Sequence, residues 1–194
     1  MGSNTPECRV DGILLLDKPA KITSNAALQA VRRLLGRPKA GHTGTLDPEA
    51  TGLLPVCFGE ATKFSSMLLD ADKTYVAIIK LGQVTSTGDA EGELIETRPV
   101  QINADGIDGI LRQFTGGILQ VPPMYSAIKL NGKPLYAYAR KGLEVERTAR
   151  TVRVHQIELL ATRPEELEIL VRCSKGTYIG FWRKTLGGRW VAVA

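Results

Sequence analysis

Short apolar runs, separated by glycine, proline and charged residues, recur along the chain and predict strands. Residues 12–16 form one such run. They predict a short buried strand that ends before Pro19, because proline cannot donate a backbone hydrogen bond. Residues 53–57 predict a second strand. In residues 73–81, β-branched and apolar side chains fall on both faces, which predicts a strand that is largely buried.

Three segments are predicted to be helical. Thr23 or Ser24 can cap a helix that runs to about Leu35, with apolar residues three and four positions apart on one face. Residues 60–69 predict a shorter helix, and residues 107–114 predict another that ends before a pair of glycines.

The second half of the chain predicts a hairpin and further strands. Asn131-Gly132 lies between two short apolar segments, and this pair is typical of a two-residue hairpin turn. Residues 151–160 and 167–173 predict two strands, whereas the polar stretch 83–92 predicts a turn. Strands and helices alternate irregularly, so the sequence predicts an α+β fold with a mixed sheet.

Size and composition limit the classes of protein to which the chain can belong. Its 194 residues, 43% of them hydrophobic, suffice for one compact domain and are marginal for two. Three distant cysteines without a C-x-x-C pair, and only two histidines, predict neither a metal site nor a disulfide framework. Because no apolar run is long enough for a bilayer and no secretory signal is recognised, we expect a cytoplasmic protein without a membrane partner.

Asp47 is the first candidate for chemistry, because it follows glycines at 41 and 44 and precedes Pro48. One interpretation is structural: the aspartate caps a one-turn helix whose first residue is the proline. The other is chemical: a tight loop holds an ionised carboxylate, which acts as a nucleophile or stabilises positive charge on a sugar. A second catalytic carboxylate is not evident beside it, which argues against glycosidase chemistry.

Two tyrosines and a histidine are further candidates, each with a structural alternative. Tyr75 is either a packed aromatic or, if its face is open, a ring that stacks on a base. Tyr178, just after the strand 167–173, is either an aromatic residue at the edge of the core or, like Tyr75, a ring that stacks on a base. His42 either holds its loop or contacts a phosphate. The glycines around it do not form a nucleotide-binding motif, so no cofactor is predicted.

Residues 122–153 are rich in basic and aromatic side chains. From position 129 onward the basic residues are Lys129, Lys133, Arg140, Lys141, Arg147, Arg150 and Arg153, against Glu144 and Glu146. Cations that reach phosphates, interleaved with flat rings, are what RNA binding uses. The alternative is a solvated hairpin and helix, and the formal net charge of +5 also fits an ordinary basic protein.

Six motifs, in this order, give the chain a specific resemblance to a known family. They are G-I-L-L-L-D-K-P at 12–19, G-H-T-G-T-L-D-P-E-A-T-G at 41–52, L-P-V-C-F-G-E-A-T-K at 54–63, K-T-Y at 73–75, Q-V-P-P-M-Y-S-A-I-K at 120–129 and C-S-K-G-T-Y-I at 173–179. The chain resembles the TruB family of tRNA pseudouridine synthases from residue 12 to residue 179, and the segment around Asp47 is the most specific match.

The resemblance implies an activity and a role for each matching residue. The family converts the T-loop uridine of tRNA, position 55, to pseudouridine without a cofactor, after the base is flipped out of its stack. Asp47 matches the nucleophile, and Tyr75 matches the ring that stacks on the target base and helps to remove a proton. Substrate-binding positions are matched by His42, Tyr178, Lys18 and Lys129. The implied fold is a mixed, mostly antiparallel sheet with flanking helices and an RNA-binding insertion, in a monomer.

The resemblance ends abruptly after Ile179, where the family continues with an arginine and an amphipathic helix but this chain has Gly180. We hypothesise that one nucleotide is missing at the Gly180 codon, which puts residues 180–194 out of frame. A genuinely divergent tail is the alternative. Because the family arginine pairs with the catalytic aspartate, we expect little or no activity from this chain.

The predicted organisation has four parts and one absence. The parts are a flexible N-terminus at 1–11, an incomplete catalytic domain at 12–179, its RNA-binding insertion at about 122–153, and an aberrant tail at 180–194; a C-terminal RNA-binding domain of the PUA type is expected to be absent. The rival function is a non-catalytic protein that binds and remodels tRNA through the insertion. Salt-dependent RNA binding that survives Asp47→Asn, without product, is its expected sign.

Overall fold

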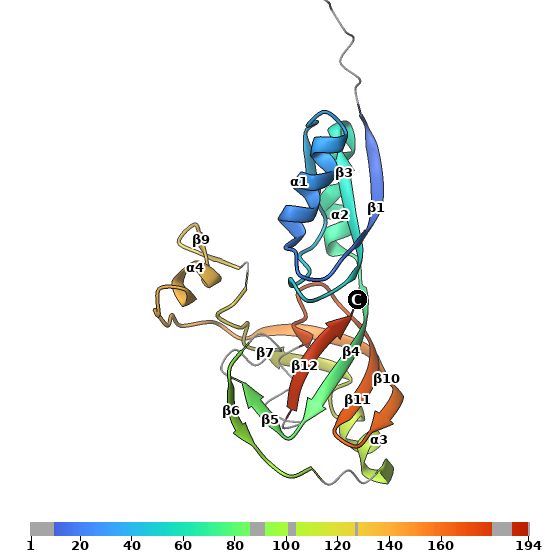
Figure 1. Ribbon diagram of the computed structural model, residues 1–194, viewed down its shortest axis with the longest axis vertical. Coiled ribbons are helices and arrows are strands. Elements are labelled where there is room, and N and C mark those ends of the chain that lie inside the picture. Colours follow the sequence, from blue (N-terminus) through green and yellow to red (C-terminus); the bar gives the residue numbers. More distant parts are fainter. Residues whose placement is uncertain (1–9, 86–91, 101–103, 127, 180–187, 194) are drawn as a thin grey trace, which may run out of the picture. The chain divides into compact units, whose positions relative to one another are not determined.

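The computed structural model describes residues 10–85, 92–100, 104–126, 128–179 and 188–193 (Figure 1). The chain forms two compact units, residues 1–71 and 72–194. Each unit has a sheet and an apolar core of its own, so each is described by itself. The boundaries predicted near residues 11 and 180 adjoin segments outside the described residues, and they stay predictions.

The first unit is a three-stranded antiparallel sheet with helices beside it. The strands stand in the order β1 (Gly12–Lys18), β3 (Gly52–Phe58) and β2 (Ala40–His42). The helices are α1 (Ser24–Leu34), the 3-10 helix η1 (Gly59–Phe64) and α2 (Ser65–Asp70). The core consists of Leu28, Val56 and Phe58, with Val10, Leu16, Val31 and Ala40 packed against them.

The elements predicted in this unit are confirmed, with one error in burial. The side-chain oxygen of Thr23 accepts a hydrogen bond from the backbone N–H of Ala26 at 3.1 Å, so Thr23 caps α1. The helix ends before Gly36, whose φ of +76° suits only the end of a helix. The burial predicted for β1 is wrong, since Leu15 is 68% exposed. β1 is an edge strand of its sheet, and an apolar pattern alone does not show whether both faces of a strand are covered.

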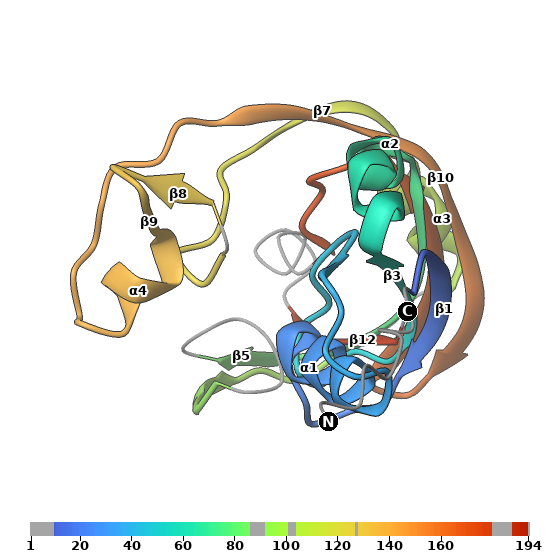
Figure 2. The ribbon, with the colours of Figure 1, turned by 90° about the horizontal axis from the view of Figure 1, so that it is seen from above.

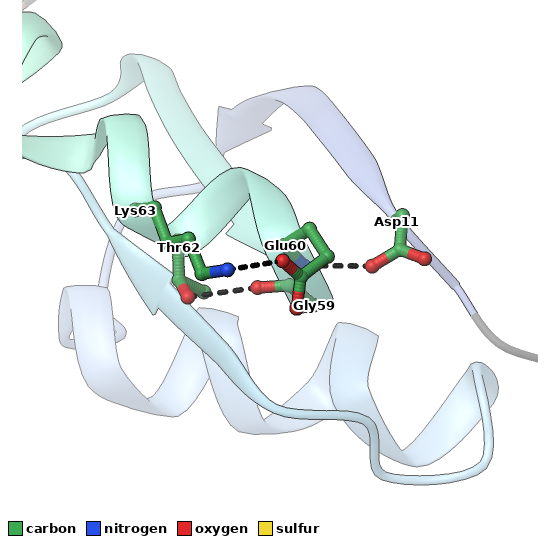
Figure 3. Close-up of polar contacts among 5 residues, drawn as sticks. All are labelled: Asp11, Gly59, Glu60, Thr62 and Lys63. Carbon is green, nitrogen blue, oxygen red and sulfur yellow. Dashed lines mark hydrogen bonds and ion pairs between the residues drawn. The ribbon is translucent and has the colours of Figure 1, made fainter.

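A carboxylate ties the start of β1 to the end of β3 (Figure 3). Asp11 Oδ1 accepts a hydrogen bond from the backbone N–H of Glu60 at 2.7 Å, in the first turn of η1, where backbone donors lack helical partners. Glu60 also forms an ion pair with Lys63. Gly59 has φ +53°, and a Cβ there would collide with Asp11 Oδ1 and lie 2.7 Å from Val10 O. The close approach of two strands therefore requires glycine at position 59.

The second unit is built on a five-stranded antiparallel sheet. Its order is β12 (Gly188–Val193), β4 (Lys73–Leu81), β11 (Glu166–Cys173), β10 (Arg150–Arg163) and β7 (Gly116–Gln120). Helix α3 (Ala104–Arg112) contacts β10, and β5 (Gln83–Thr85) pairs with β6 (Leu94–Thr97). Between β7 and β10 the chain forms β8 (Lys129–Leu130), β9 (Lys133–Pro134) and α4 (Leu135–Ala139), on an arm that leaves the sheet and returns to it (Figure 2).

The sequence predicted this core and hairpin correctly, but not every turn. Ala77 on β4 and Ile169 on β11 are fully buried and pair with each other. Asn131 and Gly132 have φ values of 50° and 78° and join β8 to β9, which confirms the hairpin. Residues 83–85 were predicted to begin a turn but pair with β6 instead, and residues 86–91 lie outside the described part of the chain.

The predicted fold class, α+β, is confirmed, with a difference in the sheet. Every strand pair described is antiparallel, whereas the sequence predicted a mixed, mostly antiparallel sheet. Residues 188–193 of the tail form β12, which pairs with β4, and the origin of the tail stays a hypothesis. Among the helices of the described ranges, none is long and apolar enough to cross a membrane.

Candidate functional site

Asp47 lies on an exposed loop of the first unit, between β2 and β3. Residues 43–51 form this segment, which we call the aspartate loop. The backbone N–H of Ala50 donates to the Asp47 carbonyl at 3.1 Å, with Pro48 as the second residue of the turn. This is a turn and not the one-turn helix of the structural alternative. The Asp47 side chain is therefore carried on a tight, solvent-facing turn.

Ser24, the first residue of α1, clamps the aspartate loop. Its hydroxyl accepts a hydrogen bond from the backbone N–H of Leu46 at 2.9 Å and donates to the Leu46 carbonyl at 3.0 Å. Ser24 is 2% exposed, so these bonds are shielded from water. Thr43 adds a second anchor, since its N–H donates to the Pro55 carbonyl at 3.0 Å. The residue before Asp47 is thus fixed by one buried side chain.

Lys18 holds the other side of the same loop. Its ammonium donates to the carbonyls of Pro19 at 2.9 Å, Ile22 at 2.8 Å and Pro48 at 3.1 Å. An ammonium has three donors, so these carbonyls use all of them. Lys18 is also completely buried. The side chain points into the protein and binds the loop backbone, and the predicted contact of Lys18 with substrate stays a prediction.

The charge of Lys18 interacts with the charge of Asp47. Burial lowers the pKa of the Lys18 ammonium, because a desolvated charge is unfavourable, while the nearby carboxylates of Asp47 and Glu49 act to raise it. The attraction between the two charges is mutual. The loop combines an exposed carboxylate with a buried cation beneath it.

His42 ends β2, opposite Val56 on β3, and leads into the aspartate loop. Its ring is partly exposed, but the Nδ1 atom is buried and has no hydrogen-bond partner within the described structure. A buried ring nitrogen without a partner is unusual in folded proteins. Neither of the two predicted uses, holding the loop or contacting a phosphate, is tested by this arrangement.

The second unit carries Tyr75 and Tyr178. Tyr75 lies on β4 opposite Val171, is half-buried, and packs against the core cluster that contains Ile179. The backbone of Tyr178 is held by a side chain that the sequence did not single out. Gln120 Nε2 donates to the Tyr178 carbonyl at 2.8 Å, and Gln120 Oε1 accepts from the Tyr178 N–H at 2.7 Å. Its signals in the sequence were its place at the end of an apolar segment and at the start of the motif 120–129.

The predicted insertion corresponds to the arm between β7 and β10. Lys129 is exposed on β8, opposite Pro134. The Arg140 guanidinium lies 5.3 Å from the centroid of the Tyr136 ring, which is 41% exposed. Tyr138, by contrast, donates its hydroxyl to the Leu130 carbonyl at 3.1 Å and holds the hairpin against α4. The arm therefore presents one aromatic–cation pair on its surface.

The predicted site residues fall into two groups, one in each unit. Lys18, His42 and Asp47 belong to the first unit, and Tyr75, Lys129 and Tyr178 belong to the second. Of the first group, the structure brings Lys18 to the loop of Asp47. Across the described ranges, no group of three or more histidine, cysteine or acidic side chains is arranged to hold a metal ion.

Comparisons with known proteins identify the family to which the chain is similar. Residues 32–179 match the family described as TruB family pseudouridylate synthase (N terminal domain). The chain is 64% identical to the tRNA pseudouridine synthase B of Aromatoleum aromaticum over 170 residues, which is 88% of this chain and 55% of that protein. It is 58% identical to the protein of the same name from an Azoarcus species over 179 residues, covering 92% of this chain and 60% of the relative. The chain thus spans 55% and 60% of the length of these two relatives.

Solved structures show the same fold. The chain matches a structure titled as a crystal structure of a Cbf5-Nop10-Gar1 complex with a TM-score of 0.69 and 29% identity, over 94% of this chain and 48% of that one. It also matches a structure of an H/ACA RNP bound to a substrate RNA containing 2'-deoxyuridine, with a TM-score of 0.65 and 26% identity, over 94% of this chain and 47% of that one.

Proposed function

The chain belongs to the TruB family of pseudouridylate synthases, and on that premise we propose that it isomerises the T-loop uridine of tRNA, position 55, to pseudouridine. The observation that carries the proposal is Asp47, an exposed carboxylate on a loop clamped by Ser24 and Lys18, inside the region that matches the family. The relatives of highest identity given above carry the name tRNA pseudouridine synthase B. We further propose that the chain acts as a cytoplasmic monomer.

The proposed reaction needs one nucleophile and no cofactor. The carboxylate of Asp47 either attacks the ribose or assists cleavage of the bond between C1′ and N1. The uracil then rotates and C5 bonds to C1′, and in the first route the bond between Asp47 and the sugar breaks, which frees the carboxylate. The proton on C5 leaves and N1 gains one, so the product is an isomer of the substrate. Lys18 supports this step by keeping the loop in place.

The remaining residues are proposed to bind the RNA. Tyr75 stacks on the flipped base and helps to remove the C5 proton, and Tyr178 borders the base. His42 and Lys129 contact the RNA around it, Lys129 from the basic arm. Support for the arm is its exposed pair of Tyr136 and Arg140, which combines a flat ring with a cation.

The rate is expected to be low, because position 180 is glycine where the family has an arginine that pairs with the aspartate. Lys18 lies beneath the loop with its donors occupied, so it does not replace a bidentate guanidinium. The frameshift hypothesis makes a direct statement about the gene. Resequencing of the locus tests it, and an intact Gly180 codon with no alternative reading contradicts it.

A tritium-release assay tests the proposed function. The chain is incubated with a T-arm stem-loop RNA that carries tritium on C5 of its uridines, because C5 loses its hydrogen only when the new bond forms. We expect slow release from the parent, no release from Asp47→Asn, and unchanged release from Asp17→Asn, which alters another exposed carboxylate of the same unit. Equal release from parent and Asp47→Asn contradicts the mechanism. Salt-dependent RNA binding without any release supports the non-catalytic rival instead.

A further inference from the structure

Gln120 is a buried polar residue that the proposed mechanism does not use. It ends β7 and is only 1% exposed. Burial of an amide is unfavourable unless its donor and its acceptor are both bonded. Here both are used on one residue: the amide nitrogen binds the Tyr178 carbonyl and the amide oxygen binds the Tyr178 N–H. The side chain therefore imitates the pairing of a neighbouring strand.

We propose that Gln120 is a positioning residue that fixes the orientation of Tyr178. Two hydrogen bonds to the N–H and carbonyl of the same residue hold the direction of its backbone as well as its position. That direction sets where the Cα–Cβ bond, and so the ring, can point. The proposal rests on the proposed function for the role of Tyr178 towards substrate, but the geometry of the pair does not depend on it.

The loop that carries Tyr178 needs such a support. Its first residue is anchored to β10, since the Ser174 N–H donates to the Arg153 carbonyl at 2.7 Å and the Ser174 hydroxyl accepts from the Arg153 N–H at 2.9 Å. The chain then turns at Gly176, which has φ +74°. Ile179 returns to the core. Gln120 joins the far side of this turn to β7, 58 positions away in the sequence.

The same residue also connects the loop to the arm. Gln120 is the last residue of β7, directly before the segment that leads to β8, β9 and α4. Gln120 therefore lies at the base of the arm and also binds the backbone of Tyr178.

Fluorine NMR of the full chain labelled with 3-fluorotyrosine tests the proposal. The chain has five tyrosines, and loss of one resonance in Tyr178→Phe assigns the signal of Tyr178. Gln120→Met keeps the length of the side chain and removes both hydrogen bonds. We expect it to shift and broaden the Tyr178 resonance while the other four keep their positions. Gln113→Met, on an exposed glutamine of the same unit, is the matched control and leaves all five unchanged.

A second variant, Gln120→Glu, uses pH as a switch. When ionised, the carboxylate accepts from the Tyr178 N–H but cannot donate to its carbonyl; when protonated, it regains the donor. Burial favours the protonated form, so the Tyr178 resonance should return towards its parental position as the pH falls from 8 to 5. Gln120→Met has no such recovery. A general loss of packing does not produce this pH-dependent return.

Tritium release adds the functional arm. In Gln120→Met we expect kcat to fall about tenfold, the effect of two buried hydrogen bonds, with KM changed by less than about twofold. A Tyr178 resonance at its parental position and width in this variant overturns the proposal, as does an equal displacement of all five resonances. If Gln120→Met does not fold, absence of pH-dependent recovery in Gln120→Glu overturns it. If the parent makes no pseudouridine, the proposed function fails while the fluorine spectra still decide the role of Gln120.

Discussion

Two neighbouring residues at the start of α1 allow the aspartate loop to be separated from the helix that supports it. Thr23 caps the helix through a bond to Ala26, whereas Ser24 clamps the loop through two bonds to Leu46. Alanine at either position removes one hydroxyl group. Thr23→Ala therefore releases the first turn of α1, whereas Ser24→Ala releases the aspartate loop. Thr23→Ala is the matched control for Ser24→Ala.

The magnitudes follow from the contacts. Loss of the cap in Thr23→Ala costs about 1 kcal/mol. Ser24→Ala loses two hydrogen bonds worth about 1 kcal/mol each. Because alanine favours the helix by up to about 0.5 kcal/mol over serine, the net loss is about 1–2 kcal/mol. The two variants should be nearly equal in stability and unequal in activity: kcat falls about tenfold in Ser24→Ala, where Asp47 is no longer fixed, and less than about twofold in Thr23→Ala.

The assay must report on the first unit alone. Both tryptophans and all five tyrosines lie in residues 72–194, so their fluorescence does not follow it. Amide hydrogen exchange measured by mass spectrometry does, and it should show faster exchange in residues 43–51 for Ser24→Ala but not for Thr23→Ala. Tritium release then gives kcat and KM for both. Equal exchange rates in the loop, or equal kcat values, would refute the reasoning.

Three further outcomes are expected. Lys18→Met leaves three carbonyls without their cation and should lower the free energy of unfolding of the first unit by about 2–4 kcal/mol. Because burial lowers the pKa of Lys18, the unfolded chain binds more protons than the folded chain just below the ordinary lysine pKa. The parent should therefore gain stability relative to this variant as the pH rises from 8 towards 10.5, and a stability difference that does not change with pH contradicts this. Gly59→Ala should lower the free energy of unfolding by about 1–3 kcal/mol, because of the positive φ and the collision of the new Cβ with Asp11. When Asp11 is already alanine, thermal melts should show that Gly59→Ala costs less stability. Arg140→Ala should weaken binding of a T-arm RNA and reduce the slope of log K against log salt by about one, whereas an unchanged slope in a salt titration places the arm away from phosphate.

The parts of the fold that the sequence predicted well are those with local causes. Asn131-Gly132 forms its hairpin because both residues adopt positive φ without outside help. The strand predicted at 73–81 has the same ends in the structure, since apolar residues on both faces suit the middle of a sheet. The sequence offered Thr23 and Ser24 as possible helix caps. Only the structure shows that Thr23 is the cap and that the Ser24 hydroxyl binds the backbone of Leu46 in the aspartate loop.

The parts that the sequence could not predict depend on partners far along the chain. The burial of Lys18 was not predicted, because a lysine in a matching motif gives no sign that three backbone carbonyls will enclose its ammonium. Gln120 was not singled out, because its partner Tyr178 is 58 positions away. The exposure of Leu15 was not predicted either. An apolar side chain on a strand is buried only if other residues cover that face of the sheet, and hydropathy alone does not show whether they do.

The order of strands sets how early each unit can form its sheet during synthesis of the chain. In the first unit every strand pair joins residues between 12 and 58, so its sheet can close soon after residue 71 leaves the ribosome, and the loop of Asp47 forms with it. In the second unit β4 is made first but lies between β11 and β12, whose residues begin at 166 and 188. Its apolar edges must therefore wait for about a hundred residues of further translation, a long separation that slows folding and invites wrong pairing. The loop of Asp47 can therefore form early, and the sheet that carries Tyr75 forms later.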